Sequence, residues 1–480
     1  MFSNTFETIM SLPFRLSYPS MSYKMFTRST LILFLTSTAL LFLYLNRIQP
    51  HYFIDEAFHI PQVLRYCAWN FTEWDPKITT LPGLYLITTA ILSPFGLCSI
   101  TCVRCVNLIG TYINLYLTYN IIKENCESNE ADRWSNWLML ASAYNITLFP
   151  PLYFWSFFYY TDVASVNTVL LMLLLHRRKR RKLSAFAGLT AVLVRQTNII
   201  WLGFLAVEHA LDIFESRMEQ PVPPRSLATP LHFRLIWKQI VYEFRKGPPS
   251  SFVGFLLQVC GSLLPYMTVC LVFVVFVAWN EGIVIGDRSA HVATVHVCQI
   301  FYFSAFVSLF SWPYAVRHRR EVLRFLRRHW AFASCAAAFV AAAIRFNTLV
   351  HPYVLADNRH YWFYVWNRFL GRYTACRYLL APVYCASLFA MSRNIGHRRF
   401  LTQINYAICV CAVLIPQLLV EPRYFILPYI FYRLNVGKPR EWQVYLESLT
   451  TLAVNLAQFL IFANKVFYWE DQPYAQRISW

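Results

Sequence analysis

Long, uninterrupted apolar blocks separated by short polar stretches dominate the hydrophobic pattern of this 480-residue chain. The block 29–46 (STLILFLTSTALLFLYLN) is long enough to cross a bilayer as a helix. Because a backbone in lipid must satisfy its own hydrogen bonds, we expect these blocks to be helical, and no sheet is expected. The pattern therefore predicts an all-α polytopic membrane protein.

The composition agrees with this class, since 57% of the residues are hydrophobic and 14% are charged. The formal net charge of +19 is concentrated in short basic runs between apolar blocks, at 176–182, 317–328 and 397–399. Basic runs that flank spans are typical of cytoplasmic connections. The charge therefore indicates topology and argues against a nucleic-acid partner.

Placing the basic runs on the cytoplasmic side determines the side of every other connection. Arg15, Lys24 and Arg28 precede the first block, so the loop that follows it is expected on the far side. Four apolar segments then precede the run at 176–182, and one of them must not cross if that run is to be cytoplasmic. The segment 83–97 contains Pro94 and Gly96 and is expected to lie at the far interface.

About thirteen crossings result from this assignment. They are expected at 29–46, 104–122, 134–150, 160–175, two short helices within 183–213 that meet at the polar residues 195–198, 252–279, 295–316, 330–350, 374–391, 401–419, 424–434 and 443–463. The chain is predicted to form one integral-membrane domain over 1–480, with a first far-side loop at 47–103 that carries interfacial helices and a cytoplasmic linker at 214–250.

The candidate chemistry gathers in the far-side loops, above all in YFIDEAFH, which holds Asp55, Glu56 and His59. Acidic residues beside a membrane need water or partners, so the pair requires an explanation. One explanation is that the pair serves in group transfer from a lipid-phosphate carrier, in which a carboxylate accepts a proton while cations stabilise the departing phosphate. An ion-pair or topology role is the alternative. His59 follows Asp55 and Glu56 at a spacing that could hold a metal on a helix, and His291 and His360 lie in other far-side loops, but a hydrogen-bonded histidine is expected and no metal is assigned.

Two further features concern cysteines and asparagines. The thirteen cysteines lie mostly in apolar blocks, and the grouping CSITCVRC at 98–105 lacks a second pair for zinc, so a structural role is expected. Two N-glycosylation sequons occur, at Asn70 and Asn145. The first lies in the far-side loop, where it would be modified if that side is lumenal, and the second lies inside a predicted span.

Six blocks of the sequence resemble the dolichyl-phosphate-glucose alpha-1,2-glucosyltransferase family. They are YFIDEAFHIPQVLRYC, WDPKITTLPGLYL, RQTNIIW, NEGIVIGDRSAH, VLADNRHYWFYVWNR and PQLLVEPRYFILPY, in the family's order from about residue 50 to 435. The last block departs from the family at Pro422.

The resemblance implies a glycosyltransferase of the GT-C type in the endoplasmic reticulum membrane, with its active site on the lumenal side. It implies dolichyl-phosphate glucose as donor and a diglucosylated, dolichyl-diphosphate-linked oligosaccharide as acceptor, joined by an inverting displacement that adds the last glucose. No tightly bound cofactor is implied, and the divalent-cation requirement is left open.

By the resemblance, Asp55 is expected to be the general base, with Glu56 orienting the acceptor. The residues expected to meet the donor phosphate are Arg359 and His360, with Arg195, Arg288, Arg368 and Arg423 as further candidates, since guanidinium binds phosphate bidentately. The expected substrate-binding residues are His59, Trp74, Asp75, Arg195, Gln196, Asp287, Arg288, Asp357, Arg359, His360, Tyr361, Arg368 and Arg423.

Two other readings compete with this one. A related lumenal glucosyl- or mannosyltransferase would use another donor or acceptor. A channel or transporter accessory protein would have no catalysis, although a transporter typically shows broken helices in matching positions of two halves, and none are found here.

Overall fold

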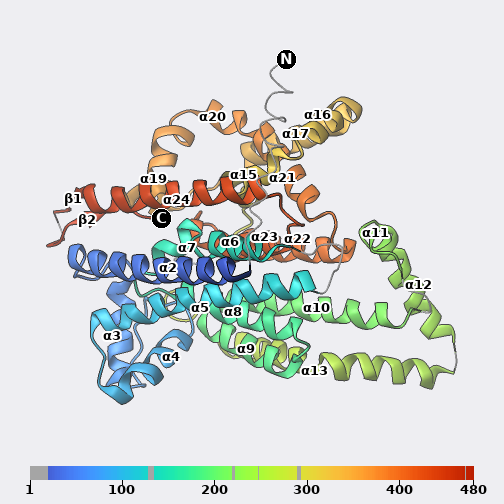
Figure 1. Cartoon of the computed structure of the whole chain (residues 1–480), viewed down its shortest axis with the longest axis horizontal. Helices are drawn as coiled ribbons and strands as arrows, with labels where there is room; N and C mark the ends of the chain where they lie inside the picture. Colours follow the sequence, from blue (N-terminus) through green and yellow to red (C-terminus); the bar gives the residue numbers. More distant parts are fainter. Residues whose placement is uncertain (1–19, 128–133, 219–221, 247, 289–292, 471) are drawn as a thin grey trace.

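The computed structural model describes residues 20–127, 134–218, 222–246, 248–288, 293–470 and 472–480. The predicted N-terminal charge at Arg15 and the candidate ligand His291 lie outside these residues. Within them, the chain is almost entirely helical, and most of its long helices run along the long axis of the molecule (Figure 1).

Every predicted crossing coincides with helical structure. The corresponding helices are α2 (Ser20–Ile48), α5 (Ile100–Glu127), α6 (Asn136–Thr147), α7 (Pro150–Trp155), α8 (Thr161–Arg177), α9 (Arg181–Val194), α10 (Ile199–Ser216), α13 (Pro249–Trp279), α14 (Cys298–Phe310), α15 (Trp312–Val316), α17 (Trp330–Asn347), α20 (Thr374–Leu379), α21 (Ala381–Ile395), α22 (Phe400–Leu414), α23 (Ile426–Asn435) and α24 (Glu441–Asn464). The predicted break at 195–198 is the short 3-10 helix η3 (Gln196–Asn198) between α9 and α10.

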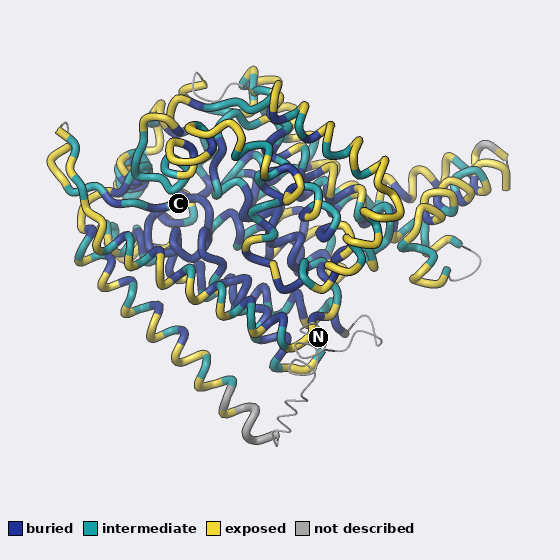
Figure 2. The backbone as a smooth tube through the Cα atoms, turned by 90° about the horizontal axis from the view of Figure 1, so that it is seen from above, coloured by how far each residue is buried: buried dark blue, intermediate teal, exposed yellow. Residues whose placement is uncertain are grey.

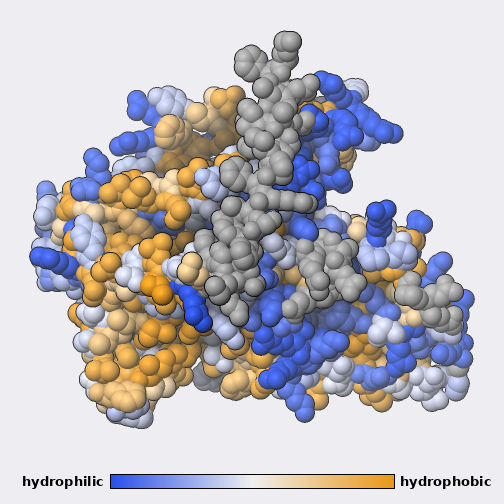
Figure 3. Space-filling model, viewed as in Figure 1, coloured by the Kyte–Doolittle hydropathy of each residue, from blue (hydrophilic) through white to orange (hydrophobic). Residues whose placement is uncertain are grey.

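Seven helices of the described residues are long and apolar enough to cross a membrane. Three shorter apolar helices accompany them, at Gly83–Phe95, Cys298–Phe310 and Phe400–Leu414. These findings confirm an all-α polytopic membrane protein, while the number of crossings stays a prediction. In the view of Figure 3, apolar surface covers the left half of the molecule, and polar surface gathers at the lower right and over α16 (Arg319–Arg328).

The core is built from aromatic and branched side chains where α5, α8, α9 and α10 pack together with α6 and α7. Figure 2 shows the buried backbone concentrated in the middle of the bundle. Trp155 and Trp201 are among the largest fully buried side chains. This aromatic core leads directly to the segment 153–160, which forms one wall of the candidate site.

One ion pair lies deep in the bundle. Arg433 of α23 donates to both carboxylate oxygens of Glu447 on α24, at 2.6 and 2.7 Å, and both side chains are almost fully buried. Tyr314 and Asn145 also donate to Glu447, at 2.7 and 3.0 Å. Because a buried charge is costly unless it is paired and hydrogen-bonded, this network holds α6, α15, α23 and α24 together.

Ion pairs also join the basic connections at one end of the bundle. Arg399 contacts Glu208, Asp212 and Glu215 on α10, at 2.6, 2.8 and 3.1 Å. The run at 176–182 reaches the same acids through Arg181, which lies 3.5 Å from Asp212. The connection at 317–328 joins through Glu321 and Arg393, at 2.7 Å. Asp212 therefore links the runs at 176–182 and 397–399, and the run at 317–328 is tied to α21, the helix that directly precedes the run at 397–399.

The predicted linker at 214–250 holds α11 (Pro224–Leu227) and α12 (Leu231–Arg245), which extend from the right edge of the molecule in Figure 1. The polar face of α12, with His232, Gln239 and Glu243, is buried against the protein. Its aromatic residues Phe233 and Trp237 are exposed instead. Apolar side chains that point outward are typical of a helix at a membrane interface.

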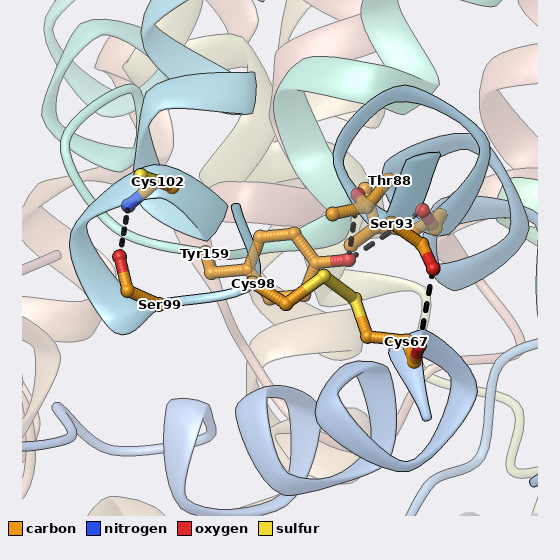
Figure 4. Close-up of a disulfide and its surroundings, with 8 residues drawn as sticks. Cys67, Thr88, Ser93, Cys98, Ser99, Cys102 and Tyr159 are labelled. Carbon is orange, nitrogen blue, oxygen red and sulfur yellow. Dashed lines mark hydrogen bonds between the residues drawn. A yellow bond between two sulfur atoms is a disulfide. The ribbon is translucent and has the colours of Figure 1, made fainter. Parts of the chain in front are cut away.

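The predicted first far-side loop, 47–103, contains α3 (Glu56–Cys67), α4 (Gly83–Leu92) and the 3-10 helix η1 (Ser93–Phe95). A disulfide joins Cys67 to Cys98, and the hydroxyl of Ser93 donates to the carbonyl of Cys67 at 3.1 Å (Figure 4). The structural role expected for the cysteine grouping at 98–105 takes the form of a crosslink at Cys98, whereas Cys102 and Cys105 are free thiols. Sequence spacing did not reveal the pairing, because the turn at η1 brings Cys98 back to the end of α3.

The last residues form a small addition to the helical fold. β1 (Val466–Phe467) and β2 (Gln476–Arg477) pair antiparallel. The expectation that no sheet forms is therefore wrong, although the sheet consists of these two short strands. Arg477 donates to the carbonyls of Ile48, Phe462 and Ala463, which ties this segment to the ends of α2 and α24.

The remaining short elements are α18 (Pro352–Ala356), α19 (Tyr361–Val365), the π-helix η4 (Trp366–Leu370) and the 3-10 helix η5 (Pro422–Phe425).

Candidate active site

Asp55 lies at the N-cap of α3, directly after the turn that follows α2. The backbone N–H of Asp55 donates to the hydroxyl of Tyr160 at 2.8 Å, and that hydroxyl donates to the carbonyl of Phe53 at 3.0 Å. These bonds fix the backbone that carries the carboxylate. The Asp55 side chain keeps 36% of its surface exposed, so the carboxylate is held in place but open to a ligand.

Arg423 is the centre of the charged cluster around Asp55. Its guanidinium donates to Asp55 at 3.1 Å, pairs with Glu421, and lies 3.7 Å from Asp162 at the start of α8. The guanidinium also lies over the rings of Trp155 and Tyr160, at 5.2 and 5.1 Å from their centroids. Aromatic faces favour a cation at such distances. Pro422 occupies the first turn of η5, where its missing N–H is no loss.

Arg195 supplies a second cation to the same cluster. It follows the last residue of α9, and its guanidinium lies 3.0 Å from Asp162 and donates to Thr161 at 3.1 Å. Asp162 is almost fully buried and contacts both arginines, Arg195 through one carboxylate oxygen and Arg423 through the other. The site therefore holds two cations beside one accessible carboxylate.

The electrostatics of the cluster keep Asp55 ionised. Burial alone raises the pKa of Asp55, but Arg423, with His59 and His360, outweighs burial and lowers the pKa below its ordinary value of 3.8. Burial lowers the pKa of His59 to about 4, so this imidazole is neutral at pH 7. His59 shares a short hydrogen bond of 2.5 Å between its Nδ1 and the hydroxyl of Tyr85.

Glu56, the neighbour of Asp55, has a different environment. Its carboxylate is fully buried and accepts from Arg104 at 2.9 and 2.6 Å, from the N–H of Tyr159 at 2.7 Å and from the N–H of Phe53 at 2.9 Å. Arg104 in turn donates to the carbonyls of Gln49 and His51, both at 2.8 Å. Glu56 was expected to orient the acceptor, but its oxygens are directed to the protein. It fixes the turn that carries Asp55.

The WDP turn packs against two other loops. Trp74 donates to the carbonyl of Ile78 at 3.3 Å, and Asp75 accepts from the N–H of Lys77 at 2.9 Å. Gln196 beside Arg195 donates to the carbonyl of Thr79 at 3.0 Å, which links this turn to the charged cluster.

The loop with Asp287 and Arg288 closes over the same turn. The N–H of Asp287 donates to the carbonyl of Pro76 at 2.6 Å. Gly286 has a positive φ of 68°, and an added Cβ would lie 2.3 Å from that carbonyl oxygen, so glycine is required for this approach. The Arg288 side chain is exposed and donates to the carbonyl of Asn280.

The segment 357–361 contains His360, which contributes to the lowered pKa of Asp55. Arg359 pairs with Asp357 at 2.7 Å and lies 4.6 Å from the ring centroid of Trp469. The last residues of the chain hold this segment, because Ser479 exchanges backbone hydrogen bonds with Arg359 and Tyr361 at 2.7 and 2.9 Å.

The structure therefore sorts the predicted residues into groups. Asp55, His59, Arg195, His360 and Arg423 share one charged cluster. The expected residues Trp74, Asp75, Gln196, Asp287 and Arg288 belong to the adjoining loops, as do Asp357, Arg359 and Tyr361. Arg368 is exposed and lies over the ring of Tyr364, at 5.3 Å from its centroid.

Three members of the cluster were not among the predicted site residues: Tyr160, Asp162 and Glu421. They lie in the polar motifs YYTD at 159–162 and EPR at 421–423, beside the predicted crossings at 160–175 and 424–434, which was the available signal. Among the described residues, no group of three or more His, Cys, Asp or Glu side chains is arranged to hold a metal ion.

The helical fold and the cluster define a multi-spanning membrane protein with an accessible carboxylate held beside two arginines. The chain belongs to the DIE2/ALG10 family, whose model matches residues 49–434. This match confirms the resemblance found in the sequence.

Several curated relatives have the name Dol-P-Glc:Glc(2)Man(9)GlcNAc(2)-PP-Dol alpha-1,2-glucosyltransferase. The relative from Drosophila melanogaster is 36% identical over 89% of this chain and 94% of its own length. Those from Rattus norvegicus and Homo sapiens are 36% and 35% identical, each over 92% of this chain and 96% of the relative. No solved structure matches the chain.

Proposed function

We propose that this chain transfers glucose from dolichyl-phosphate glucose to the terminal glucose of a diglucosylated, dolichyl-diphosphate-linked oligosaccharide. The new bond is an alpha-1,2 linkage formed by a single inverting displacement. The observation that carries the proposal is the open Asp55 carboxylate, paired at 3.1 Å with Arg423 in a chain of this family.

Asp55 is the general base in this proposal. Its carboxylate takes the proton of the acceptor 2-hydroxyl while that oxygen attacks the anomeric carbon of the donor glucose. The bond between the anomeric carbon and the phosphate oxygen breaks, and dolichyl phosphate leaves with the electron pair. Because Asp55 is ionised at neutral pH, no prior deprotonation is needed.

Arg423 and Arg195 are the proposed partners of the donor phosphate. Guanidinium groups bind phosphate oxygens in a bidentate manner and stabilise the charge that develops on the leaving group. When the donor phosphate binds Arg423, the guanidinium interacts with both the phosphate and Asp55, and its electrostatic stabilisation of the ionised Asp55 carboxylate decreases. The carboxylate then becomes a stronger base at the moment the donor is in place.

The adjoining loops are assigned to substrate binding. Trp74, Asp75, Gln196, Asp287 and Arg288 form one wall, and Asp357, Arg359, His360 and Tyr361 form another, with Arg368 at the surface. Aromatic faces stack on sugar rings, and carboxylates accept from sugar hydroxyls. Glu56 is a positioning residue, since it orients Asp55 through the turn at Phe53.

The site is proposed to face the lumen of the endoplasmic reticulum, with the linker 214–250 on the cytoplasmic side. The disulfide between Cys67 and Cys98 supports this orientation, because disulfides persist in oxidising compartments. The linked basic connections are typical of the cytoplasmic side. No tightly bound cofactor is proposed, and transfer measured with and without EDTA decides whether a divalent cation is needed.

A lipid-linked oligosaccharide profile tests this function. Cells that lack the chain should accumulate the species short of one glucose, and the wild-type chain should restore the full species. A normal profile in those cells contradicts the proposal. Accumulation of a species that lacks mannose, or more than one glucose, assigns the chain to a different step.

A further inference from the structure

The loop between α3 and α4 contains an asparagine that the transfer chemistry does not use. Asn70 begins the sequence Asn70-Phe71-Thr72, a sequon for N-linked glycosylation. We infer that Asn70 is a glycosylation site whose side-chain nitrogen carries an oligosaccharide taken from a polyprenyl-diphosphate donor. The inference rests on the lumenal orientation proposed above and on no part of the glucosyl-transfer chemistry.

Asn70 is half-buried in a turn at the surface. Oδ1 of Asn70 accepts from the hydroxyl and the N–H of Thr72, at 2.9 and 3.3 Å, which holds the sequon in an Asx turn. The following residues Phe71 and Thr72 are exposed. Among the described residues, no group accepts a hydrogen bond from Nδ2, the atom that would form the bond to the sugar.

The second sequon shows the opposite arrangement. Asn145 lies inside α6 with 5% of its surface exposed. Its Nδ2 donates to Glu447 at 3.0 Å and to the carbonyl of Val444 at 3.2 Å, and its Oδ1 accepts from Ser448 at 2.7 Å. A sugar on Asn145 would replace one of the two Nδ2 hydrogens that make these bonds and would have to fit at a buried position. The fold therefore accommodates a glycan at the first sequon and excludes one at the second.

The disulfide supports the lumenal side for the turn that carries Asn70. Cys67 is the last residue of α3, and Asn70 follows it in the same turn. A disulfide at this point places the turn in an oxidising compartment, and the lumen that oxidises thiols is also where sequons are modified.

A glycan on Asn70 leaves the active site open. Asp55 is at the beginning of α3 and Asn70 lies beyond its end, and a helix of 12 residues is about 18 Å long. The modification forms a bond between Nδ2 and the anomeric carbon of the oligosaccharide and breaks the bond from that carbon to the diphosphate. Nδ2 loses a proton and the polyprenyl diphosphate leaves. Glucosyl transfer should continue in a chain without the glycan.

The experiment compares the electrophoretic mobility of the full chain from eukaryotic microsomes before and after PNGase F. The wild-type chain and Asn145→Gln should both shift by one glycan, whereas Asn70→Gln and Thr72→Ala should not shift. Thr72→Ser keeps the hydroxyl and should retain the shift. Mass spectrometry of the peptide after PNGase F should find aspartate at position 70.

A wild-type chain that does not shift, or an Asn70→Gln chain that still does, overturns the inference. Glucosyl transfer measured in the same microsomes separates this result from the proposed function. An active chain without a glycan overturns the modification site alone, and a glycosylated chain without transfer activity counts against the proposed function alone.

Discussion

Arg423 donates to Asp55 at 3.1 Å, although the two residues are 368 positions apart in the sequence. The contact joins the turn before α3 to the turn before α23. Each partner has a further contact that holds it in place, the Tyr160 hydroxyl for Asp55 and Asp162 for Arg423. This ion pair therefore joins residues from near the beginning and near the end of the region 49–434 that the family model matches.

Replacing Asp55 with Asn removes the proposed base while keeping the size of the side chain. We expect glucosyl transfer in microsomes to fall by about 10²–10⁴-fold with an unchanged amount of protein, since general-base catalysis contributes at this level. Glu73→Gln is the matched control, because Glu73 is an exposed acid of the same loop whose carboxylate pairs with Arg65 at 3.6 Å. Full activity of Asp55→Asn removes Asp55 from the role of base.

Replacing Arg423 with Gln should change the pH profile of transfer. Burial raises the pKa of Asp55, and Arg423 is the largest influence that lowers it, so the pKa of Asp55 rises in the variant. Asp55 then becomes protonated at a higher pH, and the acid limb of kcat/KM moves upward. The KM for the donor should also rise, because a phosphate partner is lost. Arg65→Gln, an exposed arginine of α3, should leave both unchanged, and an unshifted acid limb in Arg423→Gln contradicts the electrostatic account.

Glu56→Gln tests the positioning role of the buried carboxylate. The change leaves Arg104 buried without its counter-charge, and breaking a buried pair in this way costs about 3–5 kcal/mol of stability. Thermal unfolding in detergent should therefore occur at a clearly lower temperature, in contrast to Asp55→Asn, which should unfold near the wild-type temperature. An unchanged unfolding temperature would falsify the structural role assigned to Glu56.

Acidification should destabilise the protein through His59. Its pKa is lowered from 6.5 to about 4 in the folded protein, so the folded state favours the neutral imidazole. This contribution to stability is complete above pH 6.5 and is lost as the pH falls through 4. Unfolding temperatures measured across this window should decline less for His59→Asn than for the wild type. His51→Asn changes an exposed histidine of the same loop and should follow the wild-type curve.

The disulfide should stabilise the first loop. Cys67 and Cys98 close a loop with a sequence separation of 31, and crosslinks of this kind contribute about 2–4 kcal/mol. Cys67→Ser should lower the unfolding temperature, whereas Cys102→Ser, which removes a free thiol from the same region, should have little effect. Equal effects of the two substitutions would show that the crosslink itself contributes nothing.

The helices were predictable because an apolar block in lipid must satisfy its own backbone hydrogen bonds and therefore forms a helix. Charged or polar residues such as Arg195 and Gln196 mark where such a block is interrupted. The interior of the first loop was less predictable. α3 is a helix because its apolar face packs on α4, and that partner is not visible from the twelve residues of α3 alone. The hydrophobic pattern of the sequence therefore predicted the helices of the bundle better than it predicted the structure of the loop at 47–103.

The candidate site was predictable in its motifs but not in the roles of its members. Asp55 and Glu56 are adjacent and chemically alike, and their tertiary partners distinguish them, Arg423 for Asp55 and Arg104 for Glu56. Arg104 lies in an apolar segment beside three cysteines, where it had no apparent partner in the sequence. The pairing of Arg423 with Asp162 depends likewise on helix packing, which brings the start of α8 beside η5.

The buried pair of Arg433 and Glu447 bears on how the chain is assembled. The two residues are 14 positions apart, on the consecutive helices α23 and α24, so opposite charges meet within a single helical hairpin. If both helices cross as the sequence predicts at 424–434 and 443–463, either helix alone would bring an uncompensated charge into the membrane. Biosynthetic insertion should therefore treat α23 and α24 as one unit, in which the second helix neutralises the first during translation.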